Sequence, residues 1–114
     1  MHELYIAQSI LETAVTHCME NGCSRIESVT VQVGLAAGVM SEALAFAFDA
    51  LKGGTIAETA ELIIEKITPQ CVCKNCLEIF EPAEVFLTSC PNCLSSDVNI
   101  TKGFELQLLQ LEAL

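Results

Sequence analysis

Four of the seven cysteines in this 114-residue chain stand in two pairs whose spacing is typical of a metal site. The pattern is C-x2-C-x13-C-x2-C, formed by Cys73, Cys76, Cys90 and Cys93. A two-residue gap lets both sulfurs of a pair reach one ion, and two such knuckles complete a tetrahedron with Zn–S bonds of about 2.3 Å. Four soft thiolates suit Zn²⁺ or an iron centre. A site closed by four sulfurs leaves no position for a catalytic water, which predicts a structural metal.

Two other readings of this cysteine-rich segment stay open from the residues alone. One is an electron carrier, because the run Cys90-Pro91-Asn92-Cys93 resembles the knuckle of rubredoxins. The other is a zinc ribbon that grips nucleic acid. The net charge of the segment, −3, argues against the second interpretation, because nucleic-acid-binding proteins need a basic surface. This charge is the sum of one lysine, Lys74, and four acidic residues, Glu78, Glu81, Glu84 and Asp97.

Three cysteines lie outside the pattern. Cys71 is expected to be a partly exposed thiol, with alternate ligation as the other reading, whereas Cys18 and Cys23 are expected to be buried as small apolar groups. The first residues carry no basic or long apolar segment typical of a secretory signal, so we expect a cytoplasmic protein with reduced thiols. Metal ligation is therefore favoured over disulfides. His17 is expected to be a solvated helix residue.

A second candidate metal site lies at the start of the chain. His2 follows the α-amine directly, and a residue as large as His at this position is expected to leave Met1 in place. The amine, the imidazole and the backbone amides of His2 and Glu3 form a compact set of nitrogen donors. Square-planar nitrogen coordination suits Ni(II) or Cu(II) rather than Zn²⁺. The positive end of a helix opposes a cation here, and Glu3 would offset that charge. From the residues alone the alternative stays open that this terminus binds no metal and that the chain is a protein-interaction module stabilised by the metal of the four cysteines.

Helix and strand patterns flank the cysteine-rich segment. They predict two helices, over residues 4–20 and 41–51, and three strands, over residues 27–33, 61–68 and 103–111. An apolar stripe runs along the first helix from Leu4 to Cys18, and Asn21-Gly22 supplies its stop. Ser41 is expected to cap the second helix.

The predicted fold is therefore α+β. Two helices pack on a small three-stranded sheet, residues 1–69 with 101–114, and a zinc-ribbon-like lobe, residues 70–100, is inserted before the last strand. Phe80 and Phe86 are expected to form the small core of that lobe. With 52% hydrophobic residues the chain can build a core, and its formal net charge of −10 argues against nucleic acid and anionic membranes as partners.

Three features together resemble the HypA/HybF family, the nickel metallochaperones of NiFe-hydrogenase maturation. They are the MHE start, the C-x2-C-x13-C-x2-C insertion at about two-thirds of the chain, and the closing GFEL strand. Supporting positions are Gly34, Leu44, Phe48 and the segment 54–64. The resemblance covers essentially the whole chain.

The resemblance implies a non-catalytic nickel carrier. It implies that Met1, His2 and Glu3 form the nickel site, with His2 as the essential side chain, and that the four paired cysteines hold a structural zinc. The implied partners are a HypB-type nickel-handling GTPase and the hydrogenase large-subunit precursor. Some members also serve urease, which adds urease maturation proteins as partners, and the sequence leaves open whether the chain forms a homodimer.

The chain departs from the family at the residue that follows each knuckle. Leu77 and Leu94 stand where glycine is frequent, which predicts strain or a shifted turn at both places. No histidine follows either knuckle, so we do not expect a histidine-dependent pH response of the zinc site.

Overall fold

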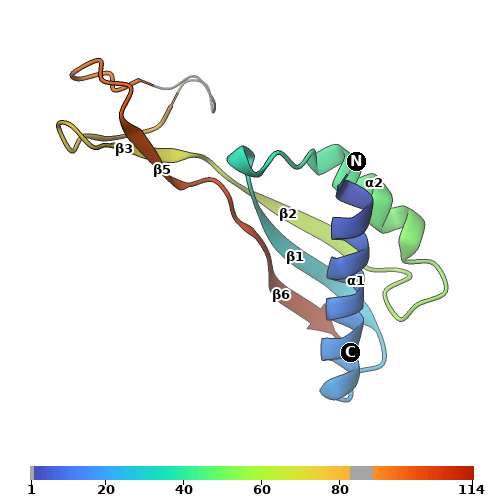
Figure 1. The fold of residues 1–114 in the computed structure, drawn as a ribbon. Helices are drawn as coiled ribbons and strands as arrows, with labels where there is room; N and C mark the ends of the chain where they lie inside the picture. Colours follow the sequence, from blue (N-terminus) through green and yellow to red (C-terminus); the bar gives the residue numbers. More distant parts are fainter. Residues whose placement is uncertain (1, 83–88) are drawn as a thin grey trace. The chain divides into compact units, whose positions relative to one another are not determined.

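The computed structural model describes residues 2–82 and 89–114. The element order in these ranges is α1 (Glu3–Glu20), β1 (Ile26–Gly34), η1 (Leu35–Ala37), α2 (Ser41–Leu51), β2 (Glu61–Ile67), β3 (Gln70–Cys73), β4 (Ile79–Phe80), β5 (Val98–Lys102) and β6 (Leu106–Ala113) (Figure 1). The chain divides into two compact units, the first made of Met1–Gln32, Val39–Glu65 and Gln107–Leu114, the second of Val33–Gly38 and Lys66–Leu106. The domain limits at residues 70 and 100 stay a prediction.

Helix α1 carries the apolar stripe that its sequence predicts. Its buried apolar residues are Ala7, Ile10, Leu11, Ala14 and Cys18. Leu4 does not continue this stripe as predicted: it is 51% exposed, and Glu3 takes the buried position in the first turn instead. The helix ends where predicted: Asn21 is its C-cap and Gly22 adopts φ 73°, the left-handed conformation that glycine tolerates.

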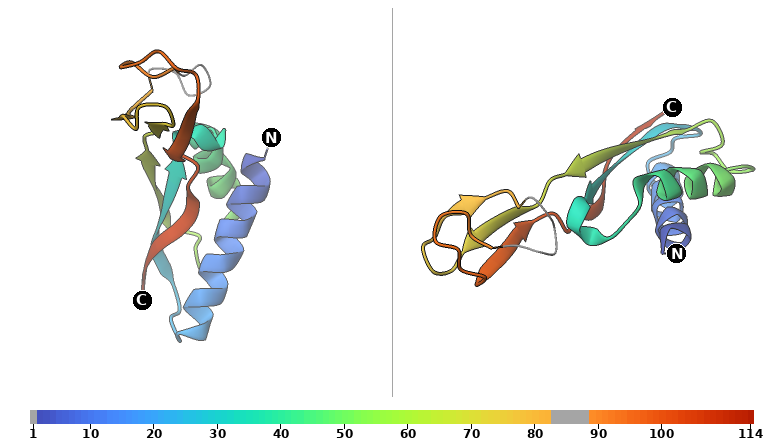
Figure 2. Two further views of the ribbon diagram at one scale, coloured as in Figure 1. Left: turned by 60° about the vertical axis from the view of Figure 1, so that its left-hand side comes forward. Right: turned by 90° about the horizontal axis from the view of Figure 1, so that it is seen from above.

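Helix α2 buries Leu44, Ala47 and Phe48 and packs against α1. The prediction that Ser41 caps this helix is wrong. Met40 is the N-cap residue and has extended backbone angles, but its side chain makes no capping hydrogen bond. Ser41 is already the first helical residue. Both helices lie on the same face of the three-stranded sheet of the first unit (Figure 2).

That sheet has the strand order β2-β1-β6, which confirms the predicted three strands with two helices. The central strand β1 buries Val29, Val31 and Val33 completely, as its alternation predicts. Strand β6 runs antiparallel to β1, because Arg25 and Leu114 exchange backbone hydrogen bonds at one end and Gly34 donates to the Glu105 carbonyl near the other. The core of this unit lies between β1 and the two helices.

The closing strand begins at Leu106 and not at Gly103 as predicted, because Gly103 makes a turn. Its φ is 119°, its N–H donates to the Glu105 carboxylate over 2.8 Å, and its carbonyl accepts from Ala36 over 2.7 Å. The same carbonyl lies so close to Gly34 that a Cβ there would collide with it. Gly34 is thus required by close backbone approach.

The second unit contains a sheet that the sequence patterns do not predict. Its order is β4-β3-β5, with both neighbours antiparallel to β3. Val72 pairs with Ile79 and Cys73 pairs with Val98. Phe80 is half-buried, whereas Phe86 lies outside the described residues, so the predicted Phe80–Phe86 core stays a prediction. Together the two units confirm an α+β fold with a zinc-ribbon-like lobe.

Candidate metal centres

Each cysteine pair forms a tight turn, and the two turns have the same geometry. In the first, the N–H groups of Asn75 and Cys76 both donate to the Cys73 sulfur over 3.4 Å. In the second, the N–H groups of Asn92 and Cys93 donate to the Cys90 sulfur over the same distance. Two backbone donors thus converge on the first sulfur of each turn and hold it in place.

The two turns face one another and bring four sulfurs together. The Cys73 and Cys93 sulfurs lie 3.6 Å apart, and the Cys76 and Cys90 sulfurs lie 3.5 Å apart. All four lie within 4.8 Å of one another. Sulfurs bound at about 2.3 Å around one tetrahedral ion would be ~3.8 Å apart. The residues present therefore fit a four-thiolate metal site.

Side-chain amides add donors that the sequence analysis missed. The Asn75 amide reaches the Cys93 sulfur of the other turn over 3.5 Å, and the Asn92 amide reaches the Cys76 sulfur over 3.5 Å. The signal was present in the sequence, since both turns read Cys-x-Asn-Cys. These bonds could not be deduced from spacing, because each one joins residues of different turns.

Hydrogen bonds and burial shift the pKa values of these thiols in opposite directions. The Asn75 amide, followed by the backbone of Ser95, lowers the pKa of the Cys93 thiol to about 6. The Asn92 amide, followed by the backbone of Glu78, lowers the pKa of Cys76. Burial raises the pKa of Cys90 to about 11. A cation at the centre of the four sulfurs would favour the thiolate at every position.

The residues that follow the turns confirm the predicted strain. Leu77 and Leu94 both have φ 65°, in the left-handed region where a Cβ is unfavourable. Both side chains point to solvent, with 73% and 79% of their surfaces exposed. Burial therefore does not offset this strain at either leucine.

Cys71 does not behave as predicted. It was expected to be partly exposed, but it lies on the central strand β3 between β4 and β5 and is fully buried. Burial raises the pKa of its thiol. Among the described residues it does not belong to the metal-binding group, which contains the four paired cysteines alone.

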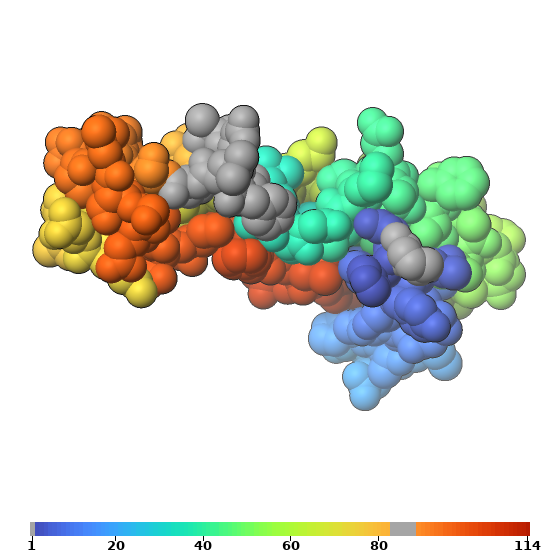
Figure 3. Space-filling model, turned by 45° about the horizontal axis from the view of Figure 1, so that its top comes forward, coloured from blue at the N-terminus to red at the C-terminus, as the bar shows by residue number. Residues whose placement is uncertain are grey.

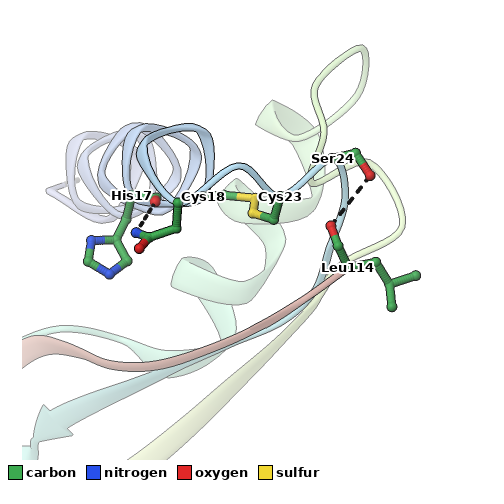
Figure 4. The surroundings of a disulfide bond; sticks show 6 residues. His17, Cys18, Cys23, Ser24 and Leu114 are labelled. Carbon is green, nitrogen blue, oxygen red and sulfur yellow. Dashed lines mark hydrogen bonds between the residues drawn. A yellow bond between two sulfur atoms is a disulfide. The ribbon is translucent and has the colours of Figure 1, made fainter.

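Cys18 and Cys23 are expected to be buried, reduced thiols, and the reduced state is wrong, because the structure joins the two residues in a disulfide (Figure 4). The turn at Asn21-Gly22 brings their Cα atoms to 5.2 Å, a separation that disulfides commonly span. Cys18 is buried, whereas Cys23 is half-buried. His17, the neighbour of Cys18, is exposed as predicted.

At the other candidate site, Met1 lies outside the described residues and His2 is exposed as the N-cap of α1. The His2 carbonyl accepts from Ile6 over 3.0 Å, which begins the helix. Glu3 is buried, and one of its carboxylate oxygens accepts from the Met40 N–H over 3.0 Å. The pKa of the Glu3 carboxyl is lowered to about 2, and this donor is the largest cause. The first turn of α1 lies beside the start of α2 at the surface of the first unit (Figure 3).

Glu3 thus has a partner that sequence reasoning missed, in a segment 37 residues away.

In the described part of the chain, neither helix has the length and apolarity that crossing a membrane requires.

Comparison with known proteins gives consistent results over the whole chain. A family model described as "Hydrogenase/urease nickel incorporation, metallochaperone, hypA" matches residues 1–113. A hydrogenase maturation factor HypA from a Picosynechococcus species is 38% identical over 114 residues, all of both chains, and one from Rhizobium leguminosarum is 32% identical over the same span. The solution structure of the Ni metallochaperone HypA from Helicobacter pylori, 30% identical, matches 100% of this chain and 98% of its own with a TM-score of 0.68. Another HypA solution structure, also 30% identical and covering 97% of its own length, gives 0.73.

Proposed function

This chain belongs to the HypA family of nickel metallochaperones and hydrogenase maturation factors, and we propose that it delivers Ni(II) to the large-subunit precursor of a NiFe-hydrogenase. In this proposal the chain is a carrier and not an enzyme. It works in the cytoplasm, and its two domains, residues 1–69 with 101–114 and residues 70–100, have different tasks.

The observation that carries the proposal is the closed geometry of the four sulfurs. Every cysteine of the group faces the three others, with sulfur contacts as short as 3.5 Å, so the group suits a retained ion rather than a transferred one. Cys73, Cys76, Cys90 and Cys93 would hold zinc, which supplies a structural cross-link when bound. The nickel cargo then needs donors elsewhere in the chain.

The start of the chain supplies such donors. His2 is exposed, and its ring is open to an ion and to a receiving protein. We assign the nickel site to the α-amine of Met1, the imidazole of His2 and the backbone amides of His2 and Glu3, a planar nitrogen set that suits Ni(II). The Glu3 carboxylate is held by Met40, so in this assignment Glu3 contributes its amide and anchors the turn that carries His2.

Release follows from the exposed position of this site. A HypB-type nickel-handling GTPase and the hydrogenase precursor are the proposed partners, with urease maturation proteins as further clients and a homodimer as a further assembly. A partner that offers better donors, or that rearranges the first turn of α1, would take the ion. The acidic exterior, net −10, would steer cations and basic partner surfaces toward the chain.

The test compares nickel binding by isothermal titration in three variants of the zinc-loaded protein. His2→Ala and a chain extended before Met1 should both lose nickel binding while they keep zinc and the helical circular dichroism signal. The matched control is His17→Ala, which removes the other histidine, also exposed on α1, and should bind nickel normally. Nickel affinity unchanged in His2→Ala would contradict the assignment.

Elemental analysis of the same samples tests the metal in the four-cysteine group. We expect one zinc per chain and a colourless protein. A coloured protein with iron in place of zinc would instead support the rubredoxin-like electron carrier, which family membership disfavours.

A further inference from the structure

The two cysteine turns are tied together by a pair of reciprocal side-chain hydrogen bonds. Asn75 of the first turn donates to the Cys93 sulfur of the second, and Asn92 of the second turn donates to the Cys76 sulfur of the first, each over 3.5 Å. Both asparagines are exposed residues, so burial does not confine their side chains. Their shared orientation therefore points to a specific use of the amides.

The asparagine amides form hydrogen bonds between the two turns, whereas the backbone donors to Cys73 and Cys90 form them within one turn. The backbone N–H bonds to Cys73 and to Cys90 each stay within one turn, because they come from the next residues along the chain. The asparagine amides cross from one turn to the other and reach the second cysteine of each pair. Cys76 and Cys93 also accept backbone N–H bonds from Glu78 and Ser95, which follow them in the chain, so the asparagine amides add the donors that cross between the turns.

We propose that Asn75 and Asn92 are positioning residues that latch the two turns around the metal and slow its loss. The inference rests on the proposed zinc site. Four thiolates and one Zn²⁺ carry a formal charge of −2, in a segment that is already acidic, so donors to sulfur stabilise the bound state. They also withdraw electron density from the sulfurs, which lowers their reactivity toward competing metals and electrophiles.

The strain at the following residues makes such a latch useful. Leu77 and Leu94 hold the left-handed conformation without glycine and without burial, so each turn is conformationally unfavourable by itself. A hydrogen bond from each turn to a sulfur of the other turn opposes the relaxation of the strained backbone. A turn that relaxed would have to break the bond that its own asparagine donates and the bond that its second cysteine accepts.

The experiment measures the rate at which the full-length, zinc-loaded protein loses zinc to an excess of a chelating indicator. Asn75→Ala and Asn92→Ala should each release zinc about tenfold faster than the natural chain, and the double variant faster still. Asn99→Ala is the matched control, since Asn99 is an exposed asparagine on β5 of the same unit and its loss should leave the rate unchanged. Asn75→Asp keeps the shape but not the donor, and should release zinc at least as fast as Asn75→Ala.

A second readout separates loss of the donor from loss of the fold. At saturating Co(II), each alanine variant should keep the intense visible bands of a tetrahedral site, while its sulfur-to-cobalt charge-transfer band moves to lower energy. Equal release rates and equal band positions in all variants would overturn the latch while leaving the zinc site in place. A natural chain that holds no zinc would instead contradict the proposed function.

Discussion

The buried carboxylate of Glu3 accepts a hydrogen bond from the backbone N–H of Met40, and this bond fastens the first turn of α1 to the start of α2. The residue beside it, His2, carries the proposed nickel-binding ring. A rigid anchor next to an exposed donor keeps the donor in place without covering it. The bond therefore connects the stability of the first unit with its proposed cargo site.

The Glu3 bond predicts a specific acid sensitivity. Because the pKa of this carboxyl is lowered from 4.5 to about 2 in the folded chain, its contribution to stability is fully present above about pH 4.5 and is lost as the pH falls toward 2. At pH 6, Glu3→Gln should have a lower unfolding temperature than the natural chain. At pH 3 the difference in unfolding temperature between the two chains should be smaller. Circular dichroism of the helices follows this, since both helices belong to the first unit. A constant difference between the two chains across this range would contradict the prediction.

Gly34 should be intolerant of any side chain. A Cβ at this position would collide with the Gly103 carbonyl, and the backbone there cannot yield as a flexible side chain would. Gly34→Ala should lower the free energy of unfolding by about 3 kcal/mol. Gly53→Ala is the matched control, because no atom lies within 4 Å of its added Cβ, and it should be neutral or slightly stabilising. Urea titration of both variants distinguishes the two cases.

Glycine at the strained leucines should stabilise the second unit. Leu77→Gly and Leu94→Gly each remove an unfavourable left-handed conformation from an exposed residue, with a net gain of about 0.5–1 kcal/mol after the greater flexibility of glycine is counted. The gain appears as slower zinc loss to a chelator. Ile79→Gly, at an exposed residue of β4, should have the opposite sign, because glycine weakens a strand. Faster zinc loss from the two leucine variants would show that these side chains stabilise the turns.

The Cys18–Cys23 pair predicts a thiol count and a stability change. Protein purified without reductant, then denatured and freed of metal, should show five reactive thiols, rising to seven after reduction. Cys23→Ser should lower the free energy of unfolding by about 2 kcal/mol, the loop-closure contribution of a bond spanning so few residues. Seven reactive thiols before reduction would contradict the pairing.

Local patterns predicted those parts of the chain that depend on neighbours in sequence. The spacing of the cysteine pairs, the alternation of Val29, Val31 and Val33, and the stop at Asn21-Gly22 each use a few consecutive residues, and each is present in the structure. The strain at Leu77 and Leu94 was also predictable, because it follows from the residue type at one position of a known turn.

Predictions failed where the outcome depends on distant segments. The burial of Cys71 results from its place between β4 and β5, and the late start of β6 results from the packing of Gly103 against η1. At the start of α2, the N–H of Met40 donates to the distant Glu3 carboxylate, and Ser41 does not cap the helix.

The sequence by itself determined the metal-binding residue types, the two helices and the three strands of the first sheet, and the family. Only the tertiary structure decided which donors meet: the crossed amides of Asn75 and Asn92, and the Glu3 bond to Met40. The physical reason is that hydrogen bonds act over about 3 Å, whereas their partners here are 16 to 37 residues apart along the chain, so these bonds form only after folding brings the segments together.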